Sequence, residues 1–202
     1  HLLYPNTRKI SPIWATRRYE MTTNVTVTAA DEGTEQAPVT FEASPYGVSM
    51  VPDIETLHTY GWYISGDHIV LRTATSNKYP AVAQRSLLIT GQIYGIYLNG
   101  AIGVTLERVH ISAFSYGITA YQSPNAIFKN IISQRQSQGI RILSSDGCSI
   151  EHATLLKNSQ YGIYAANSQA LSLHNSAIWV SGSGDACIYL AGGSLISDYN
   201  DL

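Results

Sequence analysis

Tyrosines recur at matching places in the second half of this 202-residue chain, and their rings are suited to contacting sugars. The set that we consider comprises Tyr94, Tyr97, Tyr116, Tyr121, Tyr161, Tyr164 and Tyr189, with Arg141 at an equivalent place. Sugar C–H faces stack on aromatic rings while sugar hydroxyls bond to phenol groups, so a row of such residues predicts a polysaccharide-binding surface. Alternatively, tyrosine is a favourable strand residue whose cross-strand stacking stabilises a sheet. The sequence leaves both interpretations open.

Residues that could transfer a proton are few near these tyrosines. Arg141 is followed a few positions later by Asp146, and Asp67 and His68 occupy a separate turn sequence, Ser-Gly-Asp-His. These four are the candidates for general acid–base catalysis. Asp67, His68 and Asp146 are also typical solvated turn residues, which is the more ordinary interpretation of their pattern.

The element that positions the tyrosines is a repeat. A short phrase of the type Tyr-Gly-Ile-Tyr returns about every 22–25 residues, a period typical of repeat proteins, with its isoleucine as Ile96, Ile118, Ile140, Ile163 and Ile188. A period in this range indicates supersecondary units that bury their apolar faces only by stacking on their neighbours. The chain is therefore predicted to be a solenoid.

Each repeat contains three short alternating apolar segments with Gly, Ser and Asn between them, which predicts three strands and three turns. No sustained helical stripe of apolar residues appears, so helical and leucine-rich repeats are excluded. At about 3.3 Å per residue, three short strands and their corners close a coil of roughly 22 residues, and adjacent coils pair in parallel about 4.8 Å apart. The fold class predicted is all-β, a parallel β-helix with about 22–25 residues per coil.

The repeat resembles the right-handed parallel β-helix of the pectin-lyase-like superfamily. The Gly-Ile starts carry this resemblance, together with a polar column at the bend after the second strand: Arg108, Asn130, His152, Asn175 and Asp198. The resemblance implies an internal ladder at this bend, which Asn130 and Asn175 fit and the other three interrupt. It also implies that the outer face of the first sheet, where the tyrosines lie, is the usual substrate cleft.

The resemblance specifies the fold better than an activity. The aspartate clusters of the hydrolases and lyases of this fold are missing from the first-sheet column. A bound Ca²⁺ is expected only if the protein is a lyase, and otherwise no cofactor is expected. A metal site built from His110, Glu151 and His152 is not expected, because two coils separate equivalent positions by about 10 Å.

Composition places the chain in one domain, residues 1–202. Residues 1–90 are expected to form irregular first coils with a loop near 76–80, and residues 91–202 the regular coils. The Gly-Thr-x-x-x-Pro sequence that begins at Gly33 is expected to precede the first complete coil. The last coil stops midway, so we expect a segment of a longer protein or an end that pairs with something else.

Charged residues are only 13% of the chain, which favours a secreted or cell-surface location. The formal net charge of −2 and the scattered Lys and Arg predict no nucleic-acid partner. The chain has no apolar run of about 18 residues, the length needed to span a bilayer, so no membrane insertion is predicted. Cys148 and Cys187 are expected to be separate buried thiols, since two coils put them about 10 Å apart and a disulfide spans no more than roughly 7 Å.

Three functions remain in view. The leading hypothesis is a β-solenoid that binds polysaccharide along the tyrosine face of its first sheet, as part of a carbohydrate-active protein. The alternative is a structural subunit that self-associates end to end into a fibre through open coil ends. The third is a polysaccharide lyase or glycoside hydrolase, suggested by analogy of fold.

Overall fold

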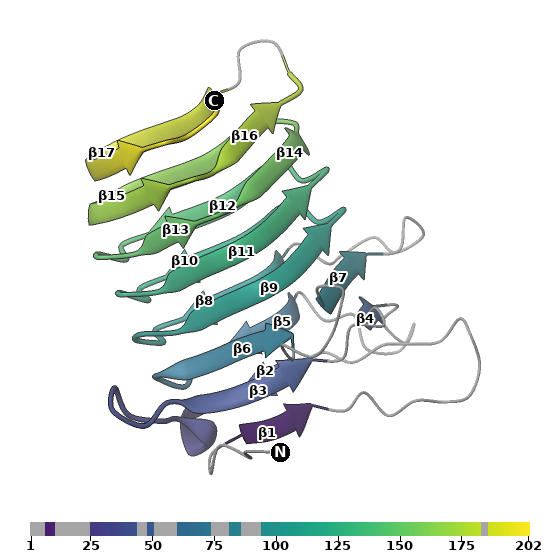
Figure 1. Ribbon diagram of the computed structural model, residues 1–202, viewed down its shortest axis with the longest axis vertical. Helices are drawn as coiled ribbons and strands as arrows, with labels where there is room; N and C mark the ends of the chain where they lie inside the picture. Colours follow the sequence, from purple (N-terminus) through teal and green to yellow (C-terminus); the bar gives the residue numbers. More distant parts are fainter. Residues whose placement is uncertain are drawn as a thin grey trace.

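A computed structural model describes residues 7–10, 25–43, 48–50, 60–73, 81–85, 94–182 and 186–202. The strands stack in layers that rise from β1 at the N-terminal end to β17 at the C-terminal end (Figure 1). All the pairings between named strands are parallel, and the strands of each coil pair with those of the neighbouring coils. The architecture is the predicted all-β right-handed solenoid.

The strands form three parallel sheets around a common interior. The first sheet contains β2 (Val25–Val27), β5 (Tyr60–Ile64), β8 (Tyr94–Asn99), β10 (Tyr116–Tyr121), β12 (Gln138–Leu143) and the first parts of β15 (Tyr161–His174) and β17 (Ala186–Asp198). The second sheet contains β1 (Thr7–Ile10), β3 (Val39–Ala43), β6 (Ile69–Thr73), the first parts of β9 (Thr105–Ser112) and β11 (Ile127–Gln134), β13 (Ser149–Glu151) and the second parts of β15 and β17. The third sheet contains β4 (Val48–Met50), β7 (Ala81–Arg85), the second parts of β9 and β11, β14 (Thr154–Asn158) and β16 (Ala177–Val180). A single 3₁₀ turn, η1 (Ala29–Asp31), precedes β3 among the described residues.

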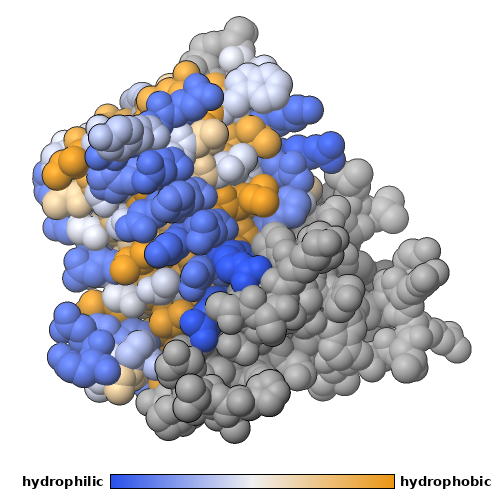
Figure 2. All heavy atoms as spheres, viewed as in Figure 1, coloured by the Kyte–Doolittle hydropathy of each residue, from blue (hydrophilic) through white to orange (hydrophobic). Residues whose placement is uncertain are grey.

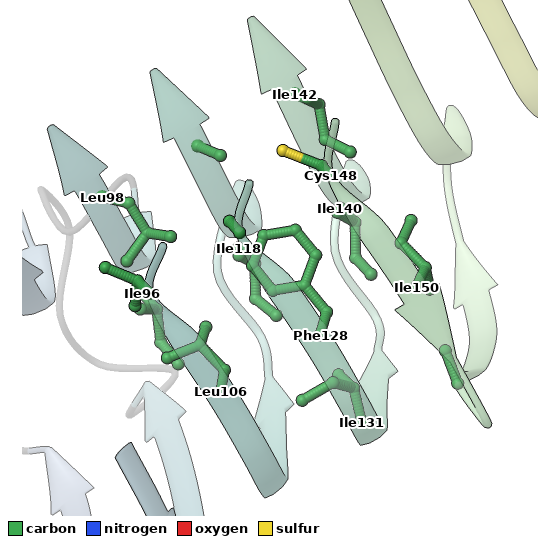
Figure 3. Close-up of a cluster of buried hydrophobic side chains, with 14 of the residues drawn as sticks. Ile96, Leu98, Leu106, Ile118, Phe128, Ile131, Ile140, Ile142, Cys148 and Ile150 are labelled. Carbon is green, nitrogen blue, oxygen red and sulfur yellow. The ribbon is translucent and has the colours of Figure 1, made fainter. Parts of the chain in front are cut away.

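The interior is lined by aliphatic columns that run along the solenoid. Ile118 pairs in register with Ile96 on one side and Ile140 on the other, and Ile140 pairs with Ile163. These four isoleucines are between 0% and 2% exposed. The side chains of Leu106, Phe128 and Ile150 face them from the second sheet (Figure 3). The predicted vertical register is confirmed, so every outward position of the first sheet is fixed as well.

The first coils are longer than the regular ones. Val25 pairs with Trp62 and Trp62 with Ile96, so each of these coils contains more than one and a half times as many residues as the coil from Ile96 to Ile118. As expected, β3 follows the turn that begins at Gly33, and the Ser65–His68 turn joins β5 to β6. The loop expected near 76–80 lies outside the described residues.

The bend between the second and third sheets differs from the prediction. Arg108, Asn130, His152 and Asn175 all have positive φ angles, from 50° to 56°, and the last three side chains are exposed. The column therefore turns the chain through the left-handed region, which Asn adopts readily, and its exposed members cannot form the predicted internal ladder. The prediction for the fifth member was also wrong by one residue: Tyr199 takes the left-handed position, while Asp198 pairs with His174.

Internal ladders do exist, but other residues form them. At this same bend, the hydroxyl of Ser176 accepts a hydrogen bond from the Ala153 N–H at 3.0 Å, and the side chain of Asn200 accepts one from the Ser176 N–H at 2.9 Å. After the first strand, the hydroxyl of Ser145 accepts a hydrogen bond from the Ser123 N–H at 2.9 Å, and that of Ser168 accepts one from the Ser145 N–H at 3.1 Å. After the third strand, the side chain of Gln136 accepts from the Phe114 N–H at 2.7 Å, and Asn158 accepts from the Gln136 N–H at 3.1 Å. These side chains satisfy backbone donors where the chain leaves a sheet and the ladder of backbone bonds is interrupted.

Candidate functional site: a tyrosine ribbon on the first sheet

The outer face of the first sheet carries one residue per coil in a straight column. In order, the residues in register are Tyr63, Tyr97, Thr119, Arg141, Tyr164 and Tyr189. A second set, Tyr94, Tyr116 and Tyr161, occupies the first position of strands β8, β10 and β15, ahead of the column in each strand. We call the column and this second set together the tyrosine ribbon.

In the N-terminal half of the ribbon, the rings touch from coil to coil. The Tyr63 and Tyr97 rings have centroids 6.0 Å apart, and the Tyr94 ring lies 4.9 Å from Tyr97 and 5.3 Å from Tyr116. These separations fall in the range in which aromatic rings attract each other. The Tyr63 hydroxyl also accepts a hydrogen bond from the Asn99 side chain at 3.0 Å. This half is therefore an ordered surface rather than a set of independent side chains.

The C-terminal half repeats this arrangement. The Tyr161 ring lies 5.0 Å from Tyr189 and 5.6 Å from Tyr164, and the Tyr164 and Tyr189 rings are 5.5 Å apart and nearly parallel, at 11°. Tyr189 is 44% exposed, so part of its ring is open to a ligand.

Arg141 joins the two halves. Its guanidinium carbon lies 4.6 Å from the centroid of the Tyr116 ring and 5.9 Å from that of Tyr164, both within the range of cation–π attraction. The contact with Tyr116 carries the side chain back over β10, the strand that bears Thr119. Thr119 lies in the outward column, in register between Tyr97 and Arg141, yet it is only 1% exposed. The ribbon is continuous, with a short side chain and a cation at its middle.

Two buried polar atoms at this midpoint have no hydrogen-bond partner in the described part of the chain: Thr119 Oγ1 and Arg141 Nε. A buried polar group without a partner is uncommon in folded proteins, because it loses its bonds to water without replacing them. The middle of the ribbon is thus the place where the first sheet is least satisfied by its own residues.

Sequence reasoning included one tyrosine that the structure separates from the ribbon and missed one that belongs to it. Tyr121 pairs with Asn99 and Leu143 at the far end of its strand, is 37% exposed, and has no ring contact with another described aromatic residue. Tyr63 belongs to the column, and the phrase Tyr-Gly-Trp-Tyr at residues 60–63 was the available signal.

The other catalytic candidates lie in the turns after the first sheet. Asp67 accepts a hydrogen bond from the Ile102 N–H at 2.7 Å, and Asp146 accepts one from the Gln169 N–H, also at 2.7 Å. Both carboxylates therefore tie the turn of one coil to the turn of the next. His68 lies at the same turn, where its ring packs against Gly103: a Cβ added to this glycine would lie 2.8 Å from its Nδ1. No ion pair between Arg141 and Asp146 occurs in the described structure.

The second sheet carries a column of alternating charge. In register from coil to coil lie Arg72, Glu107, Lys129, Glu151, His174 and Asp198. Lys129 Nζ is 4.0 Å from Glu151 Oε2, and His174 Nδ1 contacts Asp198 Oδ1. Strands β9 and β11 lie at the front of Figure 1, and hydrophilic side chains cross the middle of the same face in Figure 2. In this column each basic side chain has an acidic neighbour in register, and each acidic side chain has a basic one.

Neither histidines nor cysteines form a metal centre in the residues that the structure describes. His110 bonds to the Gln134 side chain through Nε2 at 2.8 Å, and burial lowers the pKa of this histidine. The two cysteines are free, as predicted, but only Cys148 is fully buried, and Cys187 is half-buried. Burial raises the pKa of Cys148 to about 11, which makes its thiol unreactive at neutral pH.

The comparison with family models matches residues 94–200, just over half of the chain, to the right handed beta helix region. The chain belongs to this family. No curated protein matches it. The part of the chain that the structure describes contains no helix long and apolar enough to cross a bilayer.

Solved structures of similar shape include an alginate lyase from Paenibacillus sp. str. FPU-7, with a TM-score of 0.63 and 15% identity over 91% of this chain and 70% of that one. A rhamnogalacturonan lyase has a TM-score of 0.49 and 10% identity, over 85% of this chain and 60% of that one. The periplasmic alginate epimerase AlgG has a TM-score of 0.48 and 13% identity, over 85% of this chain and 42% of that one. At these identities the likeness shows the fold alone.

Proposed function

We propose that this β-helix binds a polysaccharide along the tyrosine ribbon. The observation that carries the proposal is the unbroken series of ring contacts on the outer face of the first sheet, from Tyr63 to Tyr189. A stacked, rigid row of phenols offers flat apolar faces and polar tips, which is the combination that a sugar chain needs. The alginate lyase of similar fold, which acts on a polysaccharide, supports the proposal by analogy.

Binding, rather than hydrolysis, is the chemistry that the ribbon strands support. Strands β5, β8, β10 and β12 and residues 161–166 and 186–191 contain no Asp or Glu. A glycoside hydrolase uses a pair of carboxylates about 5–10 Å apart on either side of the scissile bond. The ribbon offers phenols and one guanidinium instead, which suit recognition of a chain held along the solenoid.

The test is affinity electrophoresis in gels that contain single polysaccharides, acidic and neutral, with the double variant Tyr97→Ala/Tyr164→Ala. We expect at least one polysaccharide to retard the protein, and the double variant to lose roughly tenfold or more in affinity, because each ring contributes about 0.5–1.5 kcal/mol. Tyr199→Ala is the matched control, since Tyr199 is 85% exposed and lies outside the ribbon.

The interpretation of the ribbon as sheet stabilisation alone predicts a different result. The double variant would then unfold at a lower denaturant concentration, while neither it nor the wild type would bind any glycan. That outcome would refute the binding proposal.

A location outside the cytoplasm belongs to this proposal, because the polysaccharide ligand is expected there and the low content of charged residues fits that location. Fractionation of the source cells, with an antibody against this domain, tests it: the protein should appear in the medium, on the surface or in the periplasm. Recovery in the cytosol would contradict this location.

End-to-end association is a second candidate, favoured by the apolar side chains on and after β17. The exposed members are Tyr189, Leu190, Ile196, Tyr199 and Leu202. Another coil covering this edge would bury them, and either a continuation of this chain or a second copy could supply it. Sedimentation velocity over a hundredfold concentration range tests this: a coefficient that rises with concentration supports stacking, and a constant monomer value opposes it.

A further inference from the structure

We propose, building on the proposed function, that the polymer bound on the ribbon is acidic and that Arg141 binds one of its carboxylates. The proposed function requires only that sugars stack on the tyrosines. The charge of the ligand is a separate inference, and it follows from the surroundings of Arg141.

The guanidinium of Arg141 is held in place without being neutralised. The rings of Tyr116 and Tyr164 flank it at 4.6 Å and 5.9 Å from their centroids. Within the described residues it forms no ion pair and no hydrogen bond, although a guanidinium has five N–H donors. Aromatic faces fix its orientation but satisfy none of these donors in the plane. Nε is buried, so the terminal N–H groups are the part of the guanidinium that is left to an anion.

On the second sheet, by contrast, basic side chains stand next to carboxylates in register. Lys129 stands between Glu107 and Glu151 in register, and His174 stands between Glu151 and Asp198. Arg141 occupies the equivalent outward position on the first sheet, but its neighbours in register are Thr119 and Tyr164. The difference is one of sequence and not of fold, because both columns obey the same coil-to-coil register. A cation without a counter-charge in the middle of a binding surface is matched to an external anion.

The unsatisfied atoms lie at the same point. Arg141 Nε and Thr119 Oγ1 are both buried without a partner among the described residues, and Thr119 is the neighbour of Arg141 in register. Two such groups side by side lower the stability of the free protein. Thr119 Oγ1 is buried beneath the surface, so an external anion would be bound by the terminal N–H groups of Arg141 alone.

A carboxylate fits this place better than a neutral hydroxyl. The planar guanidinium presents parallel N–H groups that match the two oxygens of a carboxylate, and such charge-assisted pairs are about twice as strong as neutral hydrogen bonds. Sugar units on either side of the anchored one would stack on Tyr97 and Tyr164, which flank the midpoint of the ribbon. The ligand class is therefore a polyuronate, with one carboxylate fixed at the centre of the surface.

The experiment uses alginate and polygalacturonate with their carboxyl-reduced derivatives, which keep linkage and length but lose charge. Isothermal titration calorimetry on the whole chain should show at least one acidic polymer binding about ten- to hundredfold more tightly than its reduced derivative at low salt. This preference should shrink as the salt concentration rises. Arg141→Gln should abolish the preference, and Arg141→Lys should retain part of it, because lysine keeps the charge and loses the fork.

Lys129→Gln is the matched control, since it removes the same charge from the second sheet and should leave the preference unchanged. Circular dichroism verifies the fold of each variant, and the comparison of polymers on the wild type does not depend on any variant. Equal binding of acidic and reduced polymers, or an Arg141→Gln variant that still prefers the acid, overturns this inference. In that case binding to the ribbon itself stands. If neutral and acidic polymers all fail to bind, both the inference and the proposed function are wrong.

Discussion

Removal of either of two buried hydroxyl groups is predicted to change the stability of the fold, with opposite signs for the two. Thr119 is 1% exposed, and its Oγ1 has no partner among the described residues. Ser145 is 0% exposed, and its Oγ accepts a hydrogen bond from the Ser123 N–H at 2.9 Å and donates one to the Leu143 carbonyl at 2.8 Å. The two hydroxyls are therefore about equally buried, but only the Ser145 hydroxyl has hydrogen-bond partners.

The magnitudes follow from this difference. Thr119→Val keeps the shape and the strand propensity and removes an unsatisfied hydroxyl, so it should stabilise the fold by about 1 kcal/mol. Ser145→Ala leaves the buried Ser123 N–H without an acceptor, which should cost about 1–3 kcal/mol. The Leu143 carbonyl keeps its bond from the Gln122 N–H at 3.0 Å, so only one group is orphaned.

Equilibrium unfolding in urea, followed by far-ultraviolet circular dichroism, measures both effects as shifts of the midpoint at constant slope. The same Thr119→Val protein should bind the polysaccharide of the ribbon as tightly as the wild type, since its hydroxyl is buried and does not reach the surface. If both substitutions destabilise the protein by similar amounts, Thr119 is satisfied in a way that the geometry does not show, and the reasoning fails.

Three further predictions concern the body of the solenoid. Gly162→Ala should destabilise the fold by more than about 2 kcal/mol in thermal unfolding. The reason is that an added Cβ would overlap Ile178 Cγ2 and lie 2.7 Å from the Cys187 carbonyl oxygen. A variant of unchanged stability would contradict this packing. The Cys148 thiol should resist thiol reagents in the native state, and rapid labelling at pH 8 would refute this. Its pKa rises from 9.0 to about 11 on folding. Its contribution to stability should therefore be present below about pH 9 and fall as the pH approaches 11. Lys129→Glu should place three carboxylates in a row on the second sheet and lower stability by up to about 1 kcal/mol, less so at high salt, as salt-dependent denaturation would show.

The regular coils were predictable because a closed coil restricts both length and register. A step of about 22 residues is what three short strands and their corners require, so the isoleucine column and the outward column follow from spacing alone. Tyr63 was not predicted to lie in the column, because its coil is longer than the regular ones and the same phrase therefore falls outside the regular period. The alternating charges of Glu107, Lys129 and Glu151 were visible at the regular spacing, but their significance depends on which face they share.

Corner chemistry was harder to predict. Asparagine suits both an internal ladder and a left-handed bend, so Asn130 and Asn175 could not distinguish the two, and the structure shows the bend. The serines that form the ladder after the first strand, Ser123, Ser145 and Ser168, resemble ordinary turn residues in sequence, and so does Ser176 at the bend itself. The contact of Arg141 with Tyr116 was not predicted either, since it depends on the direction in which a long side chain lies across neighbouring strands.

Binding along the ribbon is tested most directly by the dependence of affinity on ligand length. From Tyr63 to Tyr189 the column crosses five strand spacings, which is about 24 Å. Calorimetric titration with size-fractionated oligosaccharides of one polymer should therefore give an affinity that climbs with each added sugar until the ligand spans this length, and then levels off. An affinity that is already maximal for a disaccharide, or no binding at any length, would contradict the account.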